Sequence, residues 1–370
     1  MVRPVRSRRP ATLASLAAEL GVSRTTVSNA YNRPDQLSPE LRERILDTAR
    51  RLGYPGPDPL ARSLRTRQAG AVGLLLTEAL SYAFRDPAAI TFLEGLAMAC
   101  EDAGQGLLLV PASPEADERD TAAAVHQAGV DGFVVYSVPD DDPNLAAVLR
   151  RPLPTVVCDQ PQLDDVDHVG IDDRAAMENL GAHLIELGHR RIGVVCMRLG
   201  RDRHDGLVDA HRQRTAHFHV QRARLAGLAD AFGEVLLDWD AVPVVERFDH
   251  TMASGASATG ELLDQDPSLT AIVCTSDILA LGALAEIRRR GLRVPEDLTV
   301  TGFDGVPEAE RAGLTTVSQP VLEKGRTAGR LLLLDRPEPT SRTVTLSTEL
   351  VVRTSSGSAK ELDPPWFSGL

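Results

Sequence analysis

Polar side chains that can bind a small molecule stand directly after three apolar runs of the sequence. They are Asp159, Ser276, Asp277 and Asp304. An ionised carboxylate accepts hydrogen bonds, so acids at three such positions suit the recognition of hydroxyl or amine groups. An acid after a strand also commonly caps the next helix, and we predict that structural role for Asp277. The other three residues are candidate ligand contacts.

No constellation for catalysis accompanies these residues. The sequence has no GxSxG turn, no Walker glycine loop, no GxGxxG after a predicted strand and no HExxH pair. The four cysteines, Cys100, Cys158, Cys196 and Cys274, lie far apart in apolar runs without metal-ligand spacing. We therefore expect buried, reduced thiols in a protein that is not an enzyme and that holds no metal and no cofactor.

The elements that must position the candidate residues alternate along the chain after residue 70. Strands are predicted at residues 71–76, 107–110, 132–136, 155–158, 191–195, 242–245, 271–274 and 298–302. Helices are predicted between them at residues 91–103, 175–187, 221–232, 255–263 and 278–290. This alternation predicts a doubly wound α/β fold with parallel sheets, more readily two sheets than one. Such sheets bind ligands beyond the carboxyl ends of their strands.

Charge divides the chain in two. The formal net charge of all 370 residues is −12, yet residues 1–70 hold 13 arginines, no lysine and 6 acids, which gives +7. The other 300 residues therefore carry −19. A small basic head on a large acidic body predicts that the head contacts a polyanion while the body serves another purpose. The chain has no apolar run long enough to span a bilayer, so we expect no membrane contact.

Three short helices are predicted in the basic head. They cover residues 13–20, 24–31 and 39–52. Thr12, Ser23 and Ser38 place capping hydroxyls before them, and Gly21 and Gly53 can end the first and the third. The second helix is expected to turn its apolar side chains inward and to leave a compact polar face outward. That face comprises Arg24, Thr25, Ser28 and Asn29.

The first two helices have the spacing of a helix-turn-helix. Ala17 is small where two crossing helices approach, and Gly21 suits the short turn between them. Val27 is an apolar residue of the second helix that can pack between the helices. An ordinary helical hairpin is the alternative interpretation. The basic composition of the head favours the helix-turn-helix.

The segment after the third helix makes the interpretation of the basic head more specific. Three prolines fall within residues 54–59, and a short apolar and basic helix is predicted at residues 60–65, before the strand at 71–76. This order resembles the LacI/GalR (lac-repressor) family from about Thr12 to Arg353, most specifically over residues 13–66. The resemblance implies a helix-turn-helix head, a hinge helix, and two doubly wound α/β subdomains of the periplasmic-binding-protein-like type around a cleft.

The resemblance also implies how DNA is read. The second helix would enter the major groove, with Arg24, Thr25, Ser28 and Asn29 at its base-reading face. Arginine can bind guanine and asparagine can bind adenine there, although many family members have arginine where Asn29 stands. In the minor groove the resemblance places Ala61, Arg62, Leu64 and Arg65, with Leu64 as a wedge between base pairs. Packing of this short helix against the body is the alternative for Leu64.

Further effector contacts follow from the resemblance. Arg224 matches the family's arginine at the start of a helix that borders the cleft. Tyr82, Phe84 and Asp86, after the first strand, would offer stacking faces and an acceptor from the opposite side. The family often has a large aromatic residue where His250 stands and asparagine where Ser276 stands. These departures predict an effector other than a typical hexose.

A long polar insert, residues 197–219, precedes the helix of Arg224. It contains His204, His211, His217 and His219 together with five arginines. We expect a mobile flap over the cleft, with a metal site or a part in shaping the pocket as weaker alternatives.

The sequence thus predicts a cytoplasmic, DNA-binding transcriptional regulator, most readily a repressor that acts as a homodimer on a pseudo-palindromic operator. Its partners would be double-stranded DNA and a small effector, namely a sugar, a nucleoside or a related metabolite. The expected domains are residues 1–57, a hinge at 58–70, an effector-binding and dimerisation domain at 71–353, and a disordered tail at 354–370. The competing interpretations are a solute-binding protein and a sugar- or nucleoside-processing enzyme. Both leave the basic head unexplained.

Overall fold

The computed structural model of the protein describes residues 11–57, 68–76, 84–111, 118–235, 238–334 and 341–360. The chain divides into two units, residues 1–69 and 70–370, and each is described by itself. Among the described residues, no helix has both the length and the hydropathy needed to cross a membrane. The hinge residues Ala61, Arg62, Leu64 and Arg65 and the aromatic Tyr82 lie outside the described ranges.

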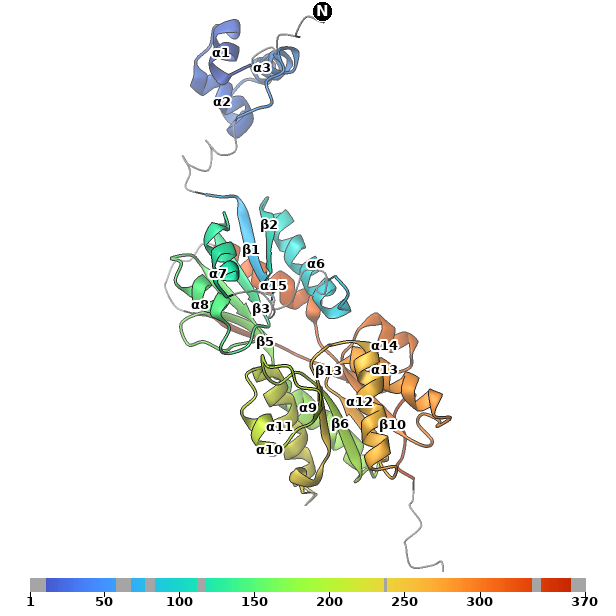
Figure 1. Ribbon diagram of the computed structural model, residues 1–370. Coiled ribbons are helices and arrows are strands. Elements are labelled where there is room, and N and C mark those ends of the chain that lie inside the picture. Colours follow the sequence, from blue (N-terminus) through green and yellow to red (C-terminus); the bar gives the residue numbers. More distant parts are fainter. Residues whose placement is uncertain are drawn as a thin grey trace, which may run out of the picture. The chain divides into compact units, whose positions relative to one another are not determined.

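The first unit contains the three predicted helices, α1 (Leu13–Leu20), α2 (Arg24–Asn32) and α3 (Pro39–Leu52), with a short 3-10 turn η1 (Pro34–Gln36) between the last two (Figure 1). The hydroxyls of Thr12, Ser23 and Ser38 each accept a backbone N–H bond at a helix start, as predicted. Gly21 and Gly53 end α1 and α3 with φ of +66° and +69°.

The core of this head is small. Its buried apolar side chains are Leu16, Ala17, Val27, Ala30, Ile45 and Ala49. They come from all three helices, and Leu16, Val27 and Ile45 have no exposed surface. So small a core leaves little stability in reserve, because a domain of this size buries only a modest fraction of its surface.

The second unit begins with a six-stranded, wholly parallel sheet in the order β12-β5-β4-β3-β1-β2. Its strands are β1 (Ala71–Leu76), β2 (Gly106–Pro111), β3 (Gly132–Tyr136), β4 (Thr155–Cys158), β5 (Asp167–Ile171) and β12 (Thr343–Leu346). Helices α6 (Pro87–Asp102) and α15 (Val321–Leu333) pack on one face. Helices α7 (Glu118–Gln127) and α8 (Pro143–Leu149) pack on the other.

A second sheet of seven strands has the order β13-β11-β10-β9-β6-β8-β7, with antiparallel strands at both edges. Its strands are β6 (Ile192–Met197), β7 (Gly206–Leu207), β8 (Val244–Arg247), β9 (Ala271–Cys274), β10 (Thr299–Asp304), β11 (Thr315–Ser318) and β13 (Glu349–Val351). The helices around it are α9 (Asp173–Glu186), α10 (Ala210–Arg214), α11 (His219–Gly233), α12 (Met252–Gln265), α13 (Asp277–Arg289) and α14 (Pro307–Arg311), with η2 (Trp239–Ala241).

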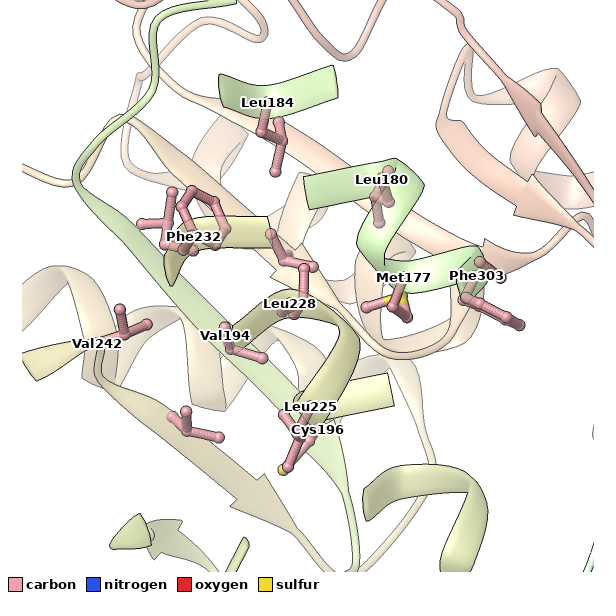
Figure 2. Packing of buried hydrophobic residues seen from close by; sticks show 14 of the residues in the cluster. Met177, Leu180, Leu184, Val194, Cys196, Leu225, Leu228, Phe232, Val242 and Phe303 are labelled. Atoms are coloured by element: carbon pink, nitrogen blue, oxygen red, sulfur yellow. The ribbon is translucent and has the colours of Figure 1, made fainter. Parts of the chain in front are cut away.

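Helices α9 and α11 cover one face of this second sheet. Figure 2 shows Leu180 and Leu184 of α9 and Leu228 and Phe232 of α11 packed beside Val194 of β6. The two helices approach so closely that a Cβ on Gly227 would lie 2.1 Å from the backbone oxygen of Arg174. This packing fixes α11, the helix that carries Arg224, against the sheet.

The two predicted sheets are therefore confirmed, and the chain crosses between them three times. The crossings lie between β5 and α9, between β11 and α15, and between β12 and β13. The sequence analysis did not predict β5, β7, β11, β12 or β13. Strand β5 was missed because it contains the polar residues Asp167 and His168 and so lacks a continuous apolar run. Asp167 is nevertheless buried, because Arg342 donates a 2.8 Å hydrogen bond to it.

The expectation of a disordered tail from residue 354 is wrong for residues 354–360. Ser355 is 3% exposed, and its hydroxyl accepts from the Thr315 N–H and donates to the Val300 oxygen. The Ala359 N–H donates to the Leu187 oxygen. These hydrogen bonds attach the segment to β10, β11 and α9, and residues 361–370 lie outside the described ranges.

Candidate functional site

A cavity, partly open to solvent, lies at the carboxyl ends of strands from both sheets. Leu76 ends β1 and Tyr136 ends β3 in the first sheet, while Met197 ends β6 and Asp304 ends β10 in the second. The remaining lining residues are Asp86, Ala88, Ala89, Ser137, Asp159, Gln160, Arg198, Phe218, Val220, Gln221, Arg224, His250 and Gln319. This is the location predicted for a ligand of a doubly wound fold.

Five of the predicted effector residues line this one cavity. They are Asp86, Asp159, Arg224, His250 and Asp304. Ser276 is not among the lining residues, because its hydroxyl caps α13 and lies 2.7 Å from His250 Nε2. Phe84 is 58% exposed and does not line the cavity. Tyr82 lies outside the described ranges.

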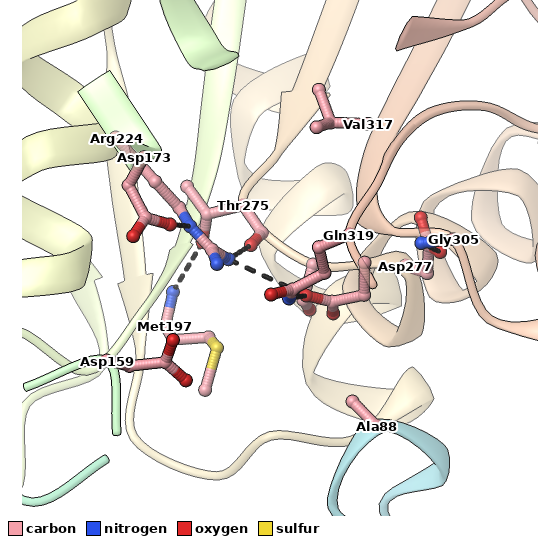
Figure 3. A network of polar contacts seen from close by, with 12 residues as sticks. Ala88, Asp159, Asp173, Met197, Arg224, Thr275, Asp277, Gly305, Val317 and Gln319 are labelled. Atoms are coloured by element: carbon pink, nitrogen blue, oxygen red, sulfur yellow. Dashed lines mark hydrogen bonds and ion pairs between the residues drawn. The ribbon is translucent and has the colours of Figure 1, made fainter. Parts of the chain in front are cut away.

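Arg224 is a cation of the cavity that several hydrogen bonds hold in place. Its Nε donates to Asp173 Oδ1 at 2.8 Å and its Nη1 to the Thr275 oxygen at 2.6 Å (Figure 3). Nη1 also lies 3.8 Å from Asp304 Oδ1, and the guanidinium lies 3.6 Å from the centroid of the Phe303 ring. With 5% of its surface exposed, Arg224 has one orientation in which to meet a ligand.

Asp304 faces Arg224 from the end of β10. Its backbone has φ of +119°, and its Oδ1 accepts from Gln319 Nε2 at 2.7 Å. Burial raises the pKa of this carboxyl to about 6, although Arg224 opposes the shift. A carboxyl with a pKa near neutrality can accept a hydrogen bond from a ligand hydroxyl or, once protonated, donate one.

Asp277 has the structural role that was predicted for it. Its Oδ2 accepts from the N–H groups of Gly305 and Val306 at 2.7 and 2.9 Å, and its Oδ1 accepts from the Thr316 hydroxyl at 2.6 Å. These bonds hold the turn that follows β10 and so fix the backbone next to Asp304 (Figure 3). Burial, together with the charge of Asp304, raises the pKa of Asp277.

His250 meets the cavity from the loop before α12. Its Nε2 lies 2.7 Å from the Ser276 hydroxyl, and its Nδ1 lies 3.8 Å from Asp86 Oδ2 at the start of α6. His250 therefore connects the second sheet's side of the cavity with the first sheet's side. Burial lowers the pKa of this imidazole to about 4, so the ring is neutral at pH 7.

Replacing His250 by glutamine removes a pH dependence of stability. Above pH 6.5 the imidazole is neutral in both states of the wild type; as the pH falls toward 4 only the unfolded state takes up the proton. The wild type should therefore lose up to about 3 kcal/mol relative to His250→Gln across this window. Thermal unfolding of both proteins at pH 7.5, 5.5 and 4.5 measures the difference, and parallel curves would contradict the assignment.

Sequence reasoning missed several lining residues. Arg198 directly follows β6 and lies 5.0 Å from the centroid of Phe218 and 5.3 Å from that of Phe248. The rule that found Asp159 and Asp304, a polar residue directly after a strand, would also have found Arg198. Gln221 lies one turn before Arg224 on α11, and its Oε1 accepts from the Thr275 hydroxyl at 2.8 Å. Its helical spacing from Arg224 was the available signal.

The polar insert, which was expected to be a mobile flap over the cleft, is attached to the second sheet by ion pairs in this structure. Arg212 of α10 donates to the buried Glu246 at 2.6 Å and to Asp202 at 3.0 Å. Arg198 and Phe218, at the two ends of the insert, line the cavity, which matches the alternative that the insert shapes the pocket. No group of three His, Cys, Asp or Glu side chains suited to a metal occurs in the described part of the chain.

The predicted DNA-facing residues lie together on α2. Arg24 and Thr25 are exposed, whereas Ser28 and Asn29 are half-buried. Asn29 Nδ2 donates to Gln36 Oε1 at 3.1 Å, and Ser28 accepts from Asn32 Nδ2. The polar face is thus presented on a helix whose opposite side holds Val27 and Ala30 in the core of the head.

Known proteins resemble this chain in both sequence and fold. Residues 182–356 match the periplasmic binding protein-like domain. The chain is 57% identical to an HTH-type transcriptional regulator of Mycobacterium tuberculosis over 351 residues, 95% of this chain and 98% of the relative. A crystal structure of a LacI family regulator from Corynebacterium glutamicum matches with a TM-score of 0.72 and 40% identity, covering 95% and 100% of the two chains. The CelR–cellobiose complex matches with a TM-score of 0.68 and 29% identity, covering 94% and 100%.

Proposed function

Since this chain belongs to the LacI family of transcriptional regulators, we propose that it is a repressor whose affinity for its operator is controlled by a small molecule bound in the cavity. The observation that carries the proposal is the cavity itself, which is lined by Asp159 after β4 of the first sheet, by Asp304 of β10 in the second sheet, and by Arg224 of α11, which packs on the second sheet. A ligand that contacts both sheets favours one arrangement of the two over another. Only such a differential affinity can shift a conformational equilibrium.

The charges of the cavity favour an uncharged, hydroxyl-rich effector. Three carboxyls, Asp86, Asp159 and Asp304, outnumber the two arginines that line it, Arg198 and Arg224, and Arg224 is already paired with Asp173. A phosphate dianion would add negative charge beside these acids, whereas hydroxyl groups can donate to the carboxylates and accept from Arg224. The effector class is therefore a sugar, a nucleoside or a related metabolite. The related CelR structure contains cellobiose, a neutral sugar.

A thermal-shift panel tests this assignment. The purified protein is screened against D-ribose, D-glucose, cellobiose, D-mannitol and adenosine, each beside its phosphorylated form where one exists. A bound compound at 100 times its Kd adds about 2.7 kcal/mol to the free energy of unfolding. We expect a shift from an uncharged member, and we expect Asp304→Asn to abolish it.

The matched control is Asp264→Asn, which removes an exposed carboxylate that pairs with Arg290 at the surface. This variant should respond to the panel as the wild type does. A shift that occurs only with phosphorylated compounds, or one that survives in Asp304→Asn, would contradict the assigned ligand class or the assigned site.

For the DNA-binding head we propose that Arg24, Thr25, Ser28 and Asn29 read bases in the major groove and that the hinge residues Ala61, Arg62, Leu64 and Arg65 contact the minor groove. The exposure of Arg24 and Thr25 on α2 supports the first assignment. We further propose a cytoplasmic homodimer on a pseudo-palindromic operator, with a head at residues 1–57, a hinge at 58–70 and an effector-binding domain at 71–353.

Loss of the Arg24 side chain should relax specificity at one operator position. Operator fragments are first selected from random DNA with the wild-type protein. Arg24→Ala should then weaken binding to the selected operator by about 1–3 kcal/mol and leave binding to random DNA nearly unchanged. Leu64→Ala should show the same asymmetry, because a wedge acts only in the bent, specific complex. Equal losses on both DNAs would contradict these assignments.

A further inference from the structure

Lys324 is buried directly behind the cavity. It lies on α15 with 1% of its surface exposed and is not among the lining residues. Its Nζ donates to Asp159 Oδ1 at 2.5 Å and to Gln319 Oε1 at 2.6 Å. Both acceptors belong to residues that line the cavity. A buried ammonium needs such partners, because its desolvation is costly, and here the partners are the ligand-facing groups themselves.

Gln319 carries this interaction to the other sheet. Its Nε2 donates to Asp304 Oδ1 at 2.7 Å. A side-chain amide has one acceptor end and one donor end, so the bond from Lys324 to Oε1 turns the NH₂ group toward Asp304. Gln319 lies in the crossing between β11 and α15. Asp159 follows β4 of the first sheet and Asp304 ends β10 of the second, so one ammonium is connected to acids from both sheets.

We propose that Lys324 is a positioning residue for the effector: it holds Asp159 directly, and Asp304 through Gln319, in the arrangement that binds the ligand. The inference rests on the proposed function, since it assigns a role within the same cavity. Lys324 itself stays behind the wall and does not touch the effector. It keeps the two carboxyls at a fixed separation across the crossing segment and compensates the charge of Asp159.

The chain offers a matched control for this inference. Asp167 of β5 is a buried acid of the first sheet, and Arg342 donates to it at 2.8 Å. Neither residue lines the cavity. Lys324→Met leaves the half-buried carboxylate of Asp159 without its cation, and Arg342→Met does the same to the buried carboxylate of Asp167, so both should lower the melting temperature. Only Lys324→Met should change ligand affinity.

The experiment measures affinity and stability separately. The wild type is titrated calorimetrically with D-ribose, D-glucose, cellobiose, D-mannitol and adenosine, and the tightest-binding compound is then used with both variants. We expect Lys324→Met to bind it at least tenfold more weakly and Arg342→Met to bind it within twofold of the wild type. If Lys324→Met does not fold, Lys324→Gln takes its place with an expected loss of at least fivefold.

The outcomes separate this inference from the proposed function. A wild type that binds no member of the panel would overturn the assigned ligand class and, with it, the role of Lys324. A wild type that binds, together with Lys324→Met or Lys324→Gln that binds equally well, would overturn the positioning role alone. Equal losses of affinity in the Lys324 and Arg342 variants would also overturn it, because they would report a general loss of structure.

Discussion

Arg224→Met lowers the free energy of unfolding of the second unit by about 3–5 kcal/mol and abolishes effector binding. The guanidinium is 5% exposed and donates to Asp173, which is itself 7% exposed, while Asp304 lies 3.8 Å away. Methionine fills much of the volume but leaves these acids without their cation. Removal of one partner from a buried ion pair is costly because the remaining charge stays desolvated. Thermal and denaturant unfolding measure the loss.

Two further variants identify the origin of this loss of stability. Arg174→Ala removes an exposed ion pair with Asp230 on the same pair of helices and should cost less than about 1 kcal/mol. Arg224→Met combined with Asp173→Asn should recover part of the stability, since the stranded charge is removed, but should not recover effector binding. If the double variant is no more stable than Arg224→Met, the stability assigned to this pair is wrong.

Val27→Asp abolishes DNA binding and leaves effector binding intact. Val27 has no exposed surface and lies in the six-residue core of the head. A carboxylate placed there costs several kcal/mol, which a core of this size cannot offset. The chain divides at residue 69, so the second unit keeps its own cores. Gel-shift assays with operator DNA and thermal shifts with the effector measure the two functions in one preparation.

Ala18→Asp is the charge-matched control, because Ala18 is on the exposed face of α1. It should weaken DNA binding modestly, through charge repulsion with phosphates, and leave the helices folded. Circular dichroism distinguishes the two variants, since only Val27→Asp loses helical signal from the head. A Val27→Asp protein that still binds operator would show that the head does not depend on this core.

The sequence alone determined the local features of the head. Thr12, Ser23 and Ser38 start helices because their hydroxyls cap backbone N–H groups within three residues, and Gly21 ends α1 because it adopts positive φ at low cost. Periodicity likewise located β1, β3, β4 and β9 at their exact bounds. These features depend on interactions between near neighbours, which a sequence pattern displays directly.

Only the tertiary structure decided which residues share the cavity. Asp159 and Lys324 are 165 positions apart, and no local pattern links them, yet their side chains form a 2.5 Å ion pair. Strand β5 escaped prediction for the same reason, since the charge of Asp167 is compensated there by Arg342, 175 positions away. Ser276 was predicted to contact the ligand, but its hydroxyl caps α13 and is hydrogen-bonded to His250. Hydrogen bonds and burial between distant residues depend on how the sheets and helices pack, and that packing decides which polar groups remain available to a ligand.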